Sequence, residues 1–320
     1  SGYTVGFTGK AWGPGNWQDA GWEQNPVGKA YNDLRFQEVP FKGINKMDYA
    51  GNFEAFLREK PADAPFFFWF GAFEPHRIYE YGSGEKAGMK KSDLQLPAFL
   101  PENDSIINDV LDYALEISWV DQQLEKMINL LDTSGLLENT IIVVTADNGM
   151  AFPHAKANLH EYGIHVPLAI CGPGIKGNRK VDDLVSLIDL APTFLELSRS
   201  GNMEGVTGRS LLSVLQSEAS GIVDTTRKYI VSGRERHTHA RPDNLGYPAR
   251  AIRTERYLYI RNFKPERWPV GDPRPVHQDP EPDEAELAAV VLGYEDIDDS
   301  PTKRIMLKGE NRWPHLFEIA

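Results

Sequence analysis

Short apolar runs that alternate with a long helical pattern constrain the fold of this chain more than any other feature. Residues 65–70 read Pro-Phe-Phe-Phe-Trp-Phe and residues 140–145 read Thr-Ile-Ile-Val-Val-Thr, lengths typical of strands buried on both faces. Between them, apolar residues recur at three-, four- and seven-residue spacings over residues 105–131, which predicts an amphipathic helix that Gly135 ends. This alternation predicts an α/β fold with a mixed, mainly parallel sheet flanked by helices.

Weaker patterns complete the predicted organisation. Further elements are expected as strands over residues 3–8 and 166–170 and helices over residues 52–60 and 184–197. After residue 221 the pattern changes to strands over residues 228–232 and 251–261 with no long helix between them, which predicts a smaller antiparallel subdomain. We therefore expect one domain over residues 1–221 and a second over residues 222–320.

Charge is distributed unevenly along the chain. The 320 residues carry a net charge of −12, which argues against a nucleic-acid binder that relies on phosphate neutralisation. Residues 227–267 nevertheless hold eleven basic side chains against four acidic ones, whereas residues 271–300 hold ten acidic and one basic. The basic segment is either a set of solvated strand faces and loops or a basic wall for an anionic substrate. We expect the Pro- and acid-rich segment to be a surface loop, with one weak helical patch at residues 284–292.

Polar side chains follow three of the predicted strands, where ligands bind in open α/β sheets. These residues are Lys10; His76 and Arg77; and Asp147 and Asn148, with Lys156 a little further along the chain. The oxygen atoms of Asp147 and Asn148 suit a hard cation such as Ca²⁺ or Mg²⁺. The cationic side chains suit a tetrahedral anion, and His76 suits proton transfer. Each residue alone has a structural interpretation, so it is their common placement that predicts a site.

The sequence resembles the sulfatase family over about residues 2–272. The resemblance is carried by residues 2–10, 65–77, 139–149, 156, 163–167, 172–174 and 208–212, in the order and spacing of that family. Glu-Pro-His-Arg at residues 74–77, with residues 148–153 and 156–159, is most similar to the heparan N-sulfatase (sulfamidase, N-sulfoglucosamine sulfohydrolase) branch and its bacterial relatives.

The resemblance implies an alkaline-phosphatase-like fold and hydrolysis of a sulfuric ester or sulfamate on a sulfated sugar, with N-sulfoglucosamine of heparan sulfate or heparin as one candidate. By the same analogy Asp147 and Asn148 would bind one Ca²⁺, Lys10 and Lys156 would hold the sulfate, and His76 would protonate the leaving group. The residues that would face sugar hydroxyls or further anionic groups are Arg77, Arg234, Arg236 and His237. The partner would be a sulfated glycan, with no nucleic acid and no membrane span, in a periplasmic, extracellular or lysosomal compartment.

The sequence departs from the family pattern in two ways that bear on catalytic activity. Trp12 stands where the family usually has a histidine, and neither the formylglycine motif, Cys or Ser followed by x-Pro/Ala-x-Arg, nor the accompanying metal-binding aspartate pair is found. Residues 171–174, Cys-Gly-Pro-Gly, match the first four positions of that motif, but Ile175 stands where the motif requires arginine. We therefore interpret Cys171 as structural. We therefore expect a chain truncated at both ends, whose larger domain lacks its N-terminal part and which is inactive alone.

Two alternatives remain open at this point. One is a phosphatase or phosphodiesterase of the same superfamily, whose sites usually hold two transition-metal ions through several Asp and His ligands. The other is a noncatalytic protein that binds sulfated glycans, for which Trp12 is the motivating feature.

Overall fold

A computed structural model describes residues 2–12, 15–201, 203–272, 291 and 293–308. The chain forms two compact units, Ser1–Leu137 and Glu138–Ala320. The predicted domains 1–221 and 222–320 are a different division, and they stay a prediction.

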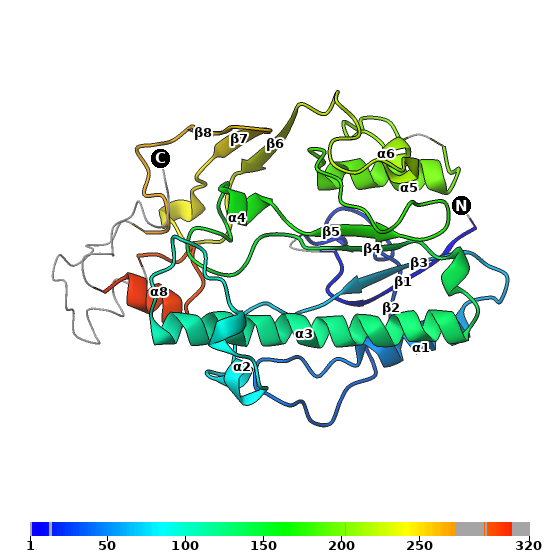
Figure 1. The fold of residues 1–320 in the computed structure, drawn as a ribbon, viewed down its shortest axis with the longest axis horizontal. Helices are drawn as coiled ribbons and strands as arrows, with labels where there is room; N and C mark the ends of the chain where they lie inside the picture. Colours follow the sequence, from blue (N-terminus) through cyan, green and yellow to red (C-terminus); the bar gives the residue numbers. More distant parts are fainter. Residues whose placement is uncertain (1, 13–14, 202, 273–290, 292, 309–320) are drawn as a thin grey trace. The chain divides into compact units, whose positions relative to one another are not determined.

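The first unit contains a parallel sheet in the order β2-β1-β3 (Figure 1). Its strands are β1 (Thr4–Gly9), β2 (Lys29–Ala30) and β3 (Phe66–Gly71), and Gly9 pairs in register with Gly71 at their carboxyl ends. Helix α1 (Tyr49–Glu59) packs on this sheet, with the Phe53 and Phe56 rings each 4.8 Å from the Phe68 ring. The parallel pairing predicted for this part of the sheet is confirmed.

The long helix expected over residues 105–131 is α3 (Asp104–Thr133). It begins where the Asn103 side chain accepts a hydrogen bond from the Ser105 amide, and Gly135 follows its end with a φ of +66°. Helix α1 contacts α3, as does the short α2 (Ser83–Lys86), and a single 3₁₀ turn, η1 (Lys91–Asp93), lies between α2 and α3 in the chain. Although α3 has 30 residues, no helix among the described residues is long and apolar enough to cross a membrane.

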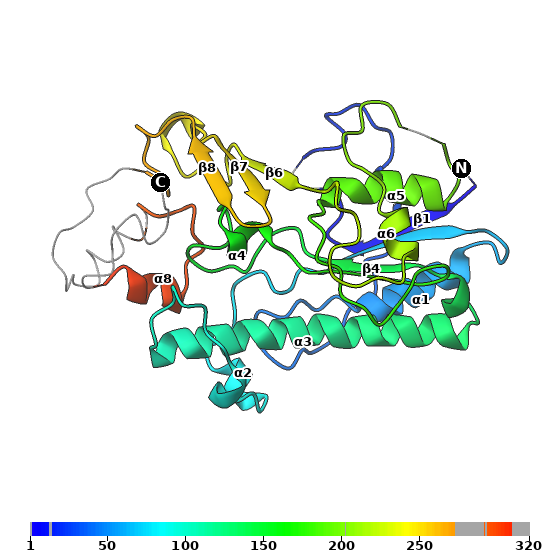
Figure 2. The ribbon, with the colours of Figure 1, turned by 45° about the horizontal axis from the view of Figure 1, so that its top comes forward.

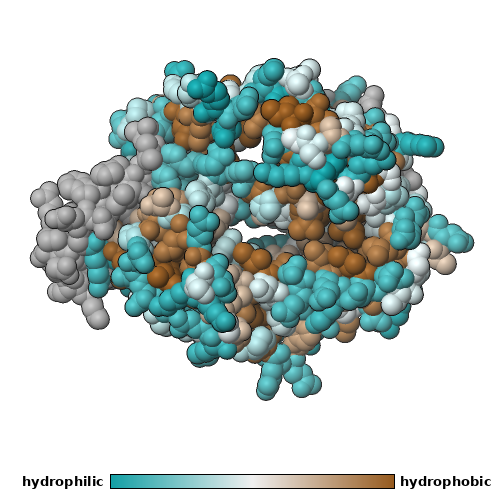
Figure 3. All heavy atoms as spheres, viewed as in Figure 1, coloured by the Kyte–Doolittle hydropathy of each residue, from teal (hydrophilic) through white to brown (hydrophobic). Residues whose placement is uncertain are grey.

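Strand β3 corrects one expectation. Its apolar run predicted burial on both faces, but in the structure Phe67 and Trp69 are 40% and 46% exposed. The reason is that α1 covers only the face that carries Phe66, Phe68 and Phe70. Apolar side chains reach the surface at several places (Figure 3).

A 3₁₀ turn, η2 (Leu137–Asn139), spans the boundary between the two units in the chain. The second unit contains a two-stranded sheet, β4 (Ile142–Thr145) with β5 (Leu168–Cys171). These strands are antiparallel, which the prediction of a mixed, mainly parallel sheet allows. The connection between them carries only the four-residue α4 (Glu161–Ile164) and closes on itself where the Gly149 amide donates to the Gly163 carbonyl at 3.1 Å. A connection without a crossover helix returns the chain to the same end of the sheet.

Three short helical elements follow β5. They are η3 (Leu187–Asp189), α5 (Leu190–Leu197) and α6 (Leu212–Gln216). The helix expected over residues 184–197 is therefore shorter than predicted, because Ser186 and Asp189 form a capping box that starts the helical turn at Leu187.

The predicted antiparallel sheet is present as β6 (Tyr229–Arg234), β7 (Ala249–Thr254) and β8 (Leu258–Asn262), shown side by side in Figure 2. The range 251–261, expected as one strand, is a hairpin of β7 and β8. Between β6 and β7 the chain forms η4 (Pro242–Asn244). One face of the sheet packs on Leu159 through Ala249 and Ala251.

The acidic segment 271–300 also differs from the expectation of a surface loop. In its described part Tyr294 is fully buried and Asp296 is 3% exposed, and α8 (Pro301–Met306) follows. The Tyr294 ring lies edge-on to the Trp268 ring at 5.7 Å, so apolar packing brings this segment inside the unit. The predicted helical patch at residues 284–292 lies outside the described residues, apart from Val291.

Candidate active site

Lys10 lies at the carboxyl end of β1, where two strand ends approach closely. The Lys10 amide donates to the Gly71 carbonyl at 2.6 Å, and a Cβ on Gly9 would lie 2.0 Å from that same oxygen. Gly9 also has a φ of +80°, so this position requires glycine for both reasons. The half-buried Lys10 ammonium lies 5.8 Å from the centre of the Phe73 ring.

His76 and Arg77 lie in the loop after β3, at the sheet edge that carries Lys10. His76 is exposed, and its Nδ1 donates to the Arg77 carbonyl at 2.8 Å, so Nε2 is the ring nitrogen outside this hydrogen bond. Arg77 binds Asp109 of α3 through two parallel hydrogen bonds of 2.6 and 2.8 Å, and both side chains are at most 5% exposed. The parallel strands therefore bring Lys10 and His76 to one edge, while Arg77 joins this loop to α3.

Asp147 and Asn148 lie in the loop after β4, in the second unit. The Asp147 side chain is exposed, and Asn148 is half-buried with its amide donating to the Gly149 carbonyl at 2.7 Å. A Cβ on Gly149 would lie 1.8 Å from the Tyr162 carbonyl oxygen, so this loop closes against α4 only with glycine at that position.

Lys156 is joined to the same loop. Its amide donates to the Met150 carbonyl at 3.0 Å, and its ammonium lies 2.8 Å from the Asp298 carboxylate. The Lys156 side chain is 13% exposed, and that of Asp298 is 24% exposed. The ammonium is therefore held by a carboxylate from the acidic segment while it keeps some access to solvent.

Asp296 gathers two arginines from the basic segment. Its carboxylate lies 2.9 Å from Arg234 and 2.7 Å from Arg241, and all three side chains are at most 11% exposed. Arg234 also donates to the Ala157 carbonyl, next to Lys156 in the chain. Since several of these guanidinium groups are paired and buried, residues 227–267 do not form a continuous free basic wall.

His237 and Arg236 follow β6. The His237 side chain is 27% exposed, and its Nδ1 donates to the Asp296 carbonyl at 3.1 Å. Burial, together with the positive charge of Lys156, lowers the pKa of His237 below its ordinary value. The imidazole is therefore neutral at pH 7 and presents Nε2 as an acceptor, whereas Arg236 is exposed.

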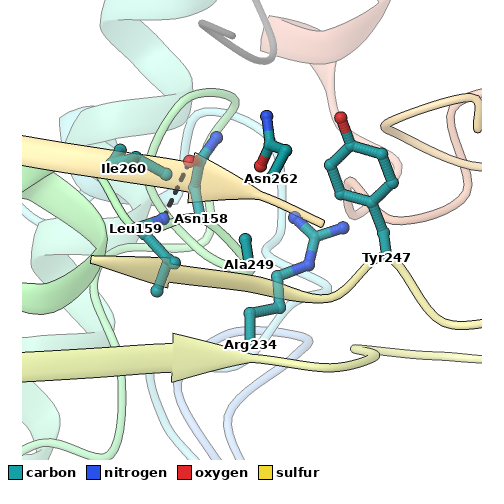
Figure 4. A pocket seen from close by; sticks show the side chains of 7 residues that line it. All are labelled: Asn158, Leu159, Arg234, Tyr247, Ala249, Ile260 and Asn262. Atoms are coloured by element: carbon teal, nitrogen blue, oxygen red, sulfur yellow. Dashed lines mark hydrogen bonds between the residues drawn. The ribbon is translucent and has the colours of Figure 1, made fainter. Parts of the chain in front are cut away.

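A small pocket lies beside Arg234 on the inner side of the three-stranded sheet (Figure 4). Arg234 extends across β7 toward Asn262 and Tyr247, and the Asn158 side chain accepts from the Leu159 amide at 2.8 Å. The pocket has a volume of about 10 Å³, which holds one water molecule but not a sugar ring.

The predicted cation ligands, Asp147 and Asn148, are consecutive residues in the loop after β4. Ca²⁺ takes six to eight oxygen ligands, and Asp147 with Asn148 supplies two donors of the right type. Among the described residues no group of three or more His, Cys, Asp or Glu side chains could hold a metal ion. The two oxygens suit a hard cation, but the described residues alone do not complete its coordination.

The structure groups the predicted residues by unit. The first unit carries Lys10, His76 and Arg77. In the second unit, Asp296 and Asp298 hold Lys156, Arg234 and His237. The adjoining segments of that unit carry Asp147, Asn148 and Arg236. Asp296 and Asp298 are not among the residues predicted from the sequence, because their segment was expected at the surface. The apolar residues Val291, Tyr294 and Ile297, spaced three apart around them, were the available signal.

Comparison with known proteins decides the family. The profile described as Sulfatase matches residues 2–200, more than half of the chain. The chain belongs to the sulfatase family. A second profile, described as N-sulphoglucosamine sulphohydrolase, C-terminal, matches residues 153–290. This second match covers the three-stranded sheet and Lys156, and it agrees with the predicted sulfamidase-like branch.

The chain is similar to curated sulfatases. It is 34% identical over 194 residues to the human N-acetylglucosamine-6-sulfatase, covering 55% of this chain and 35% of that protein. It is 30% identical over 179 residues to an ulvan-active sulfatase of Formosa agariphila, covering 56% and 28%. The human N-sulphoglucosamine sulphohydrolase is 25% identical over 250 residues, covering 68% and 47%. The chain thus spans between about a quarter and a half of the length of these relatives.

Solved structures show the same fold. A protein in complex with its substrate D-glucosamine-2-N,6-O-disulfate aligns with a TM-score of 0.54 at 19% identity, over 69% of this chain and 62% of the other. A phosphonate monoester hydrolase from Silicibacter pomeroyi aligns with a TM-score of 0.56 at 22% identity, over 66% and 51%. The predicted alkaline-phosphatase-like α/β fold is confirmed.

Proposed function

We propose that the protein carrying this sequence hydrolyses a sulfate ester or sulfamate on a sugar, with N-sulfoglucosamine units of heparan-type glycans as the substrate class. The observation that carries the proposal is the assembly of Lys156, Arg234 and His237 around two aspartates, within the part of the chain that matches the sulphoglucosamine sulphohydrolase profile.

Each residue has a distinct part in this proposal. Lys10 and Lys156 bind the oxygens of the sulfuryl group, and Asp298 keeps the Lys156 ammonium oriented until the anion competes for it. His76 donates a proton from Nε2 to the leaving atom, because its Nδ1 proton is held by the Arg77 carbonyl. Neutral His237 accepts a hydrogen bond from a sugar hydroxyl, and exposed Arg236 meets a further anionic group.

A divalent cation and a formylglycine complete the proposed chemistry. The cation, with Asp147 and Asn148 among its ligands, would neutralise charge on the sulfuryl oxygens, and the formylglycine would supply the nucleophile. Arg77 serves the site indirectly in this structure, since its guanidinium is occupied by Asp109. We propose a periplasmic, extracellular or lysosomal location on the resemblance alone.

The test is steady-state hydrolysis of glucosamine N-sulfate by the protein that carries this sequence, with Ca²⁺ present. Lys156→Met and His76→Asn are each expected to lower kcat by about 10²-fold or more, because each removes a charge or proton donor used in the transition state. Lys176→Met is the matched control, since Lys176 is a half-exposed lysine paired with Glu218. Equal activity of Lys156→Met and the control would overturn the assigned role.

The two alternatives predict different outcomes of the same assay. Turnover of phosphate monoesters or diesters above that of the sulfated sugar, with two transition-metal ions bound, would favour a phosphatase or phosphodiesterase. Tight binding of a sulfated oligosaccharide without turnover by the complete protein would favour a noncatalytic binder.

A further inference from the structure

The three-stranded sheet of the second unit has one face that the candidate site does not use. Alternation along the strands places one set of side chains opposite Ala249 and Ala251, which pack inward. This outer face consists of Tyr229 and Val231 of β6, Arg250 and Ile252 of β7, and Tyr259 and Arg261 of β8. Arg234 belongs to the inner set, so a molecule bound to the outer face would not meet it.

Exposed apolar and aromatic side chains form a row across this face. Val231, Ile252 and Tyr259 are in register on the three adjacent strands and are 57%, 38% and 63% exposed. Tyr229 is 59% exposed on the same face, and Tyr257 in the hairpin turn is 67% exposed. A contiguous exposed row of this kind on a folded domain marks an interaction surface.

Positive charge lies beside this row. Arg250 and Arg261 are directly opposite each other on β7 and β8, an arrangement of like charges that destabilises a sheet. Arg250 is paired with Glu235, whereas Arg261 lies against the Phe263 ring at 5.0 Å. Among the described residues no carboxylate pairs with Arg261, so an anion bound there would offset the repulsion.

We propose that the outer face is a docking surface for a sulfated polysaccharide chain. Guanidinium groups bind tetrahedral oxyanions through two parallel hydrogen bonds, and exposed tyrosine rings offer flat apolar faces to the CH groups of sugar rings. The positive charge of Arg261 complements a polyanion, although the chain as a whole carries −12, and Arg250 would meet a sulfate only in competition with Glu235. The choice of a polysaccharide among polyanions rests on the proposed function.

Two other occupants of the face are less favoured. Nucleic acid also combines phosphates with stacking bases, and the net charge of −12 opposes both polyanions alike, so only the proposed function favours the polysaccharide over nucleic acid. A second copy of the chain stacked on the same face by two-fold symmetry would place the arginines of both copies at one interface. Repulsion between these like charges disfavours such a dimer.

The test measures binding of a fluorescently labelled heparin oligosaccharide to the chain by anisotropy. Tyr259→Ser combined with Arg261→Ser is expected to raise Kd about tenfold, the effect of losing one charge-assisted contact and one ring contact. Tyr81→Ser combined with Arg58→Ser is the matched control, because both residues are exposed and lie in the first unit. The control variant is expected to bind as the unaltered chain does.

Further measurements separate the outcomes. The Tyr259→Ser, Arg261→Ser double variant is called the face variant. Desulfated heparin is expected to bind the unaltered chain with a Kd at least as high as that of heparin for the face variant. Turnover of monosaccharide sulfate by the complete protein is expected to be the same with and without the two substitutions of the face variant. If the proposed function is wrong, the complete protein will not hydrolyse the sulfated sugar, whereas the difference in heparin Kd between the unaltered chain and the face variant will remain. The docking proposal is overturned by equal Kd values for the face variant and the control. It is also overturned by tighter binding of a single-stranded oligonucleotide, or by dimerisation in sedimentation that the face variant abolishes.

A single Arg261→Gln variant guards against misfolding as an explanation. If it melts at the temperature of the unaltered chain and yet binds heparin equally well, the assignment of Arg261 to the docking surface is wrong.

Discussion

Single arginine–aspartate pairs hold the loops that carry the candidate site residues. Arg77 with Asp109 joins the His76 loop to α3, and Asp296 holds Arg234 beside the Lys156 loop. Buried charges of this kind cost desolvation free energy, so removing one partner leaves the other uncompensated. We therefore propose that these arginines position the loops, while the direct contact of Arg77 and Arg234 with substrate stays a prediction.

Asp109→Asn is expected to lower the free energy of unfolding by about 3–5 kcal/mol, because it leaves the Arg77 guanidinium buried beside a neutral amide. Urea denaturation followed by circular dichroism measures the change. Lys29→Gln, which removes the exposed ion pair with Glu59, serves as control and should leave unfolding unchanged. A similar midpoint for both variants would contradict the structural role of the Arg77 pair.

Glu116 on α3 predicts a pH dependence of stability. Burial, with Glu74 and Asp112 nearby, raises the pKa of Glu116 to about 8. Below the unfolded pKa near 4.5 both states are protonated; above it only the unfolded state ionises, so stability falls as pH rises toward 8. Glu116→Gln is expected to stabilise the fold by on the order of 3 kcal/mol at pH 8 and to have no effect at pH 4. A difference independent of pH, measured by thermal unfolding across this range, would refute the assignment.

At the scale of elements, glycines decide how closely the site loops approach their neighbours. Gly9 and Gly71 allow the ends of β1 and β3 to pass each other, and Gly149 allows the loop after β4 to close on Tyr162 of α4. These close contacts place Lys10 at the sheet edge and join Asp147 to the segment that carries Lys156.

Gly149→Ala is expected to lower the melting temperature, at a cost of about 1–3 kcal/mol or more, because its Cβ would lie 1.8 Å from the Tyr162 carbonyl oxygen. The same change should lower turnover, since Asn148 is the preceding residue. Gly177→Ala is the control, because a Cβ there would meet no atom within 4 Å. Calorimetry together with the sulfate-release assay measures both effects; a melting temperature equal to that of the control would show that the loop can relax.

At the scale of the whole molecule, the acidic and basic segments neutralise each other within the second unit. Asp296 and Asp298 from one segment hold Arg234, Arg241 and Lys156 from elsewhere in the chain. The excess acid of residues 271–300 is thus partly internal structure, which explains why this segment does not behave as a solvated loop in its described part.

Asp296→Asn is expected to destabilise the second unit by about 3–5 kcal/mol, because two buried guanidinium groups lose their carboxylate. Hydrogen exchange should speed up in β6 and β7 while protection of α3 in the first unit stays unchanged. Asp299→Asn is the matched control, since its partner Arg304 is half-exposed. Equal exchange rates in both variants would contradict the role of Asp296 as the link between segments.

Elements with a local signal can be predicted from the amino-acid sequence alone. The 3.6-residue periodicity of α3, the apolar run of β3 and the Gly-Lys end of β1 each follow from side-chain pattern and glycine geometry within one segment. The motif order likewise indicates the sulfatase family without knowledge of the fold, and it names the residues of the candidate site.

Which charges meet and which faces are covered depends on how distant segments fold together. The antiparallel pairing of β4 with β5, the burial of Asp296 and the exposure of Phe67 depend on segments far apart in the chain. Charge pairing and burial are properties of neighbours in space, and a carboxylate in an acidic run has the same local signal whether it faces water or two arginines.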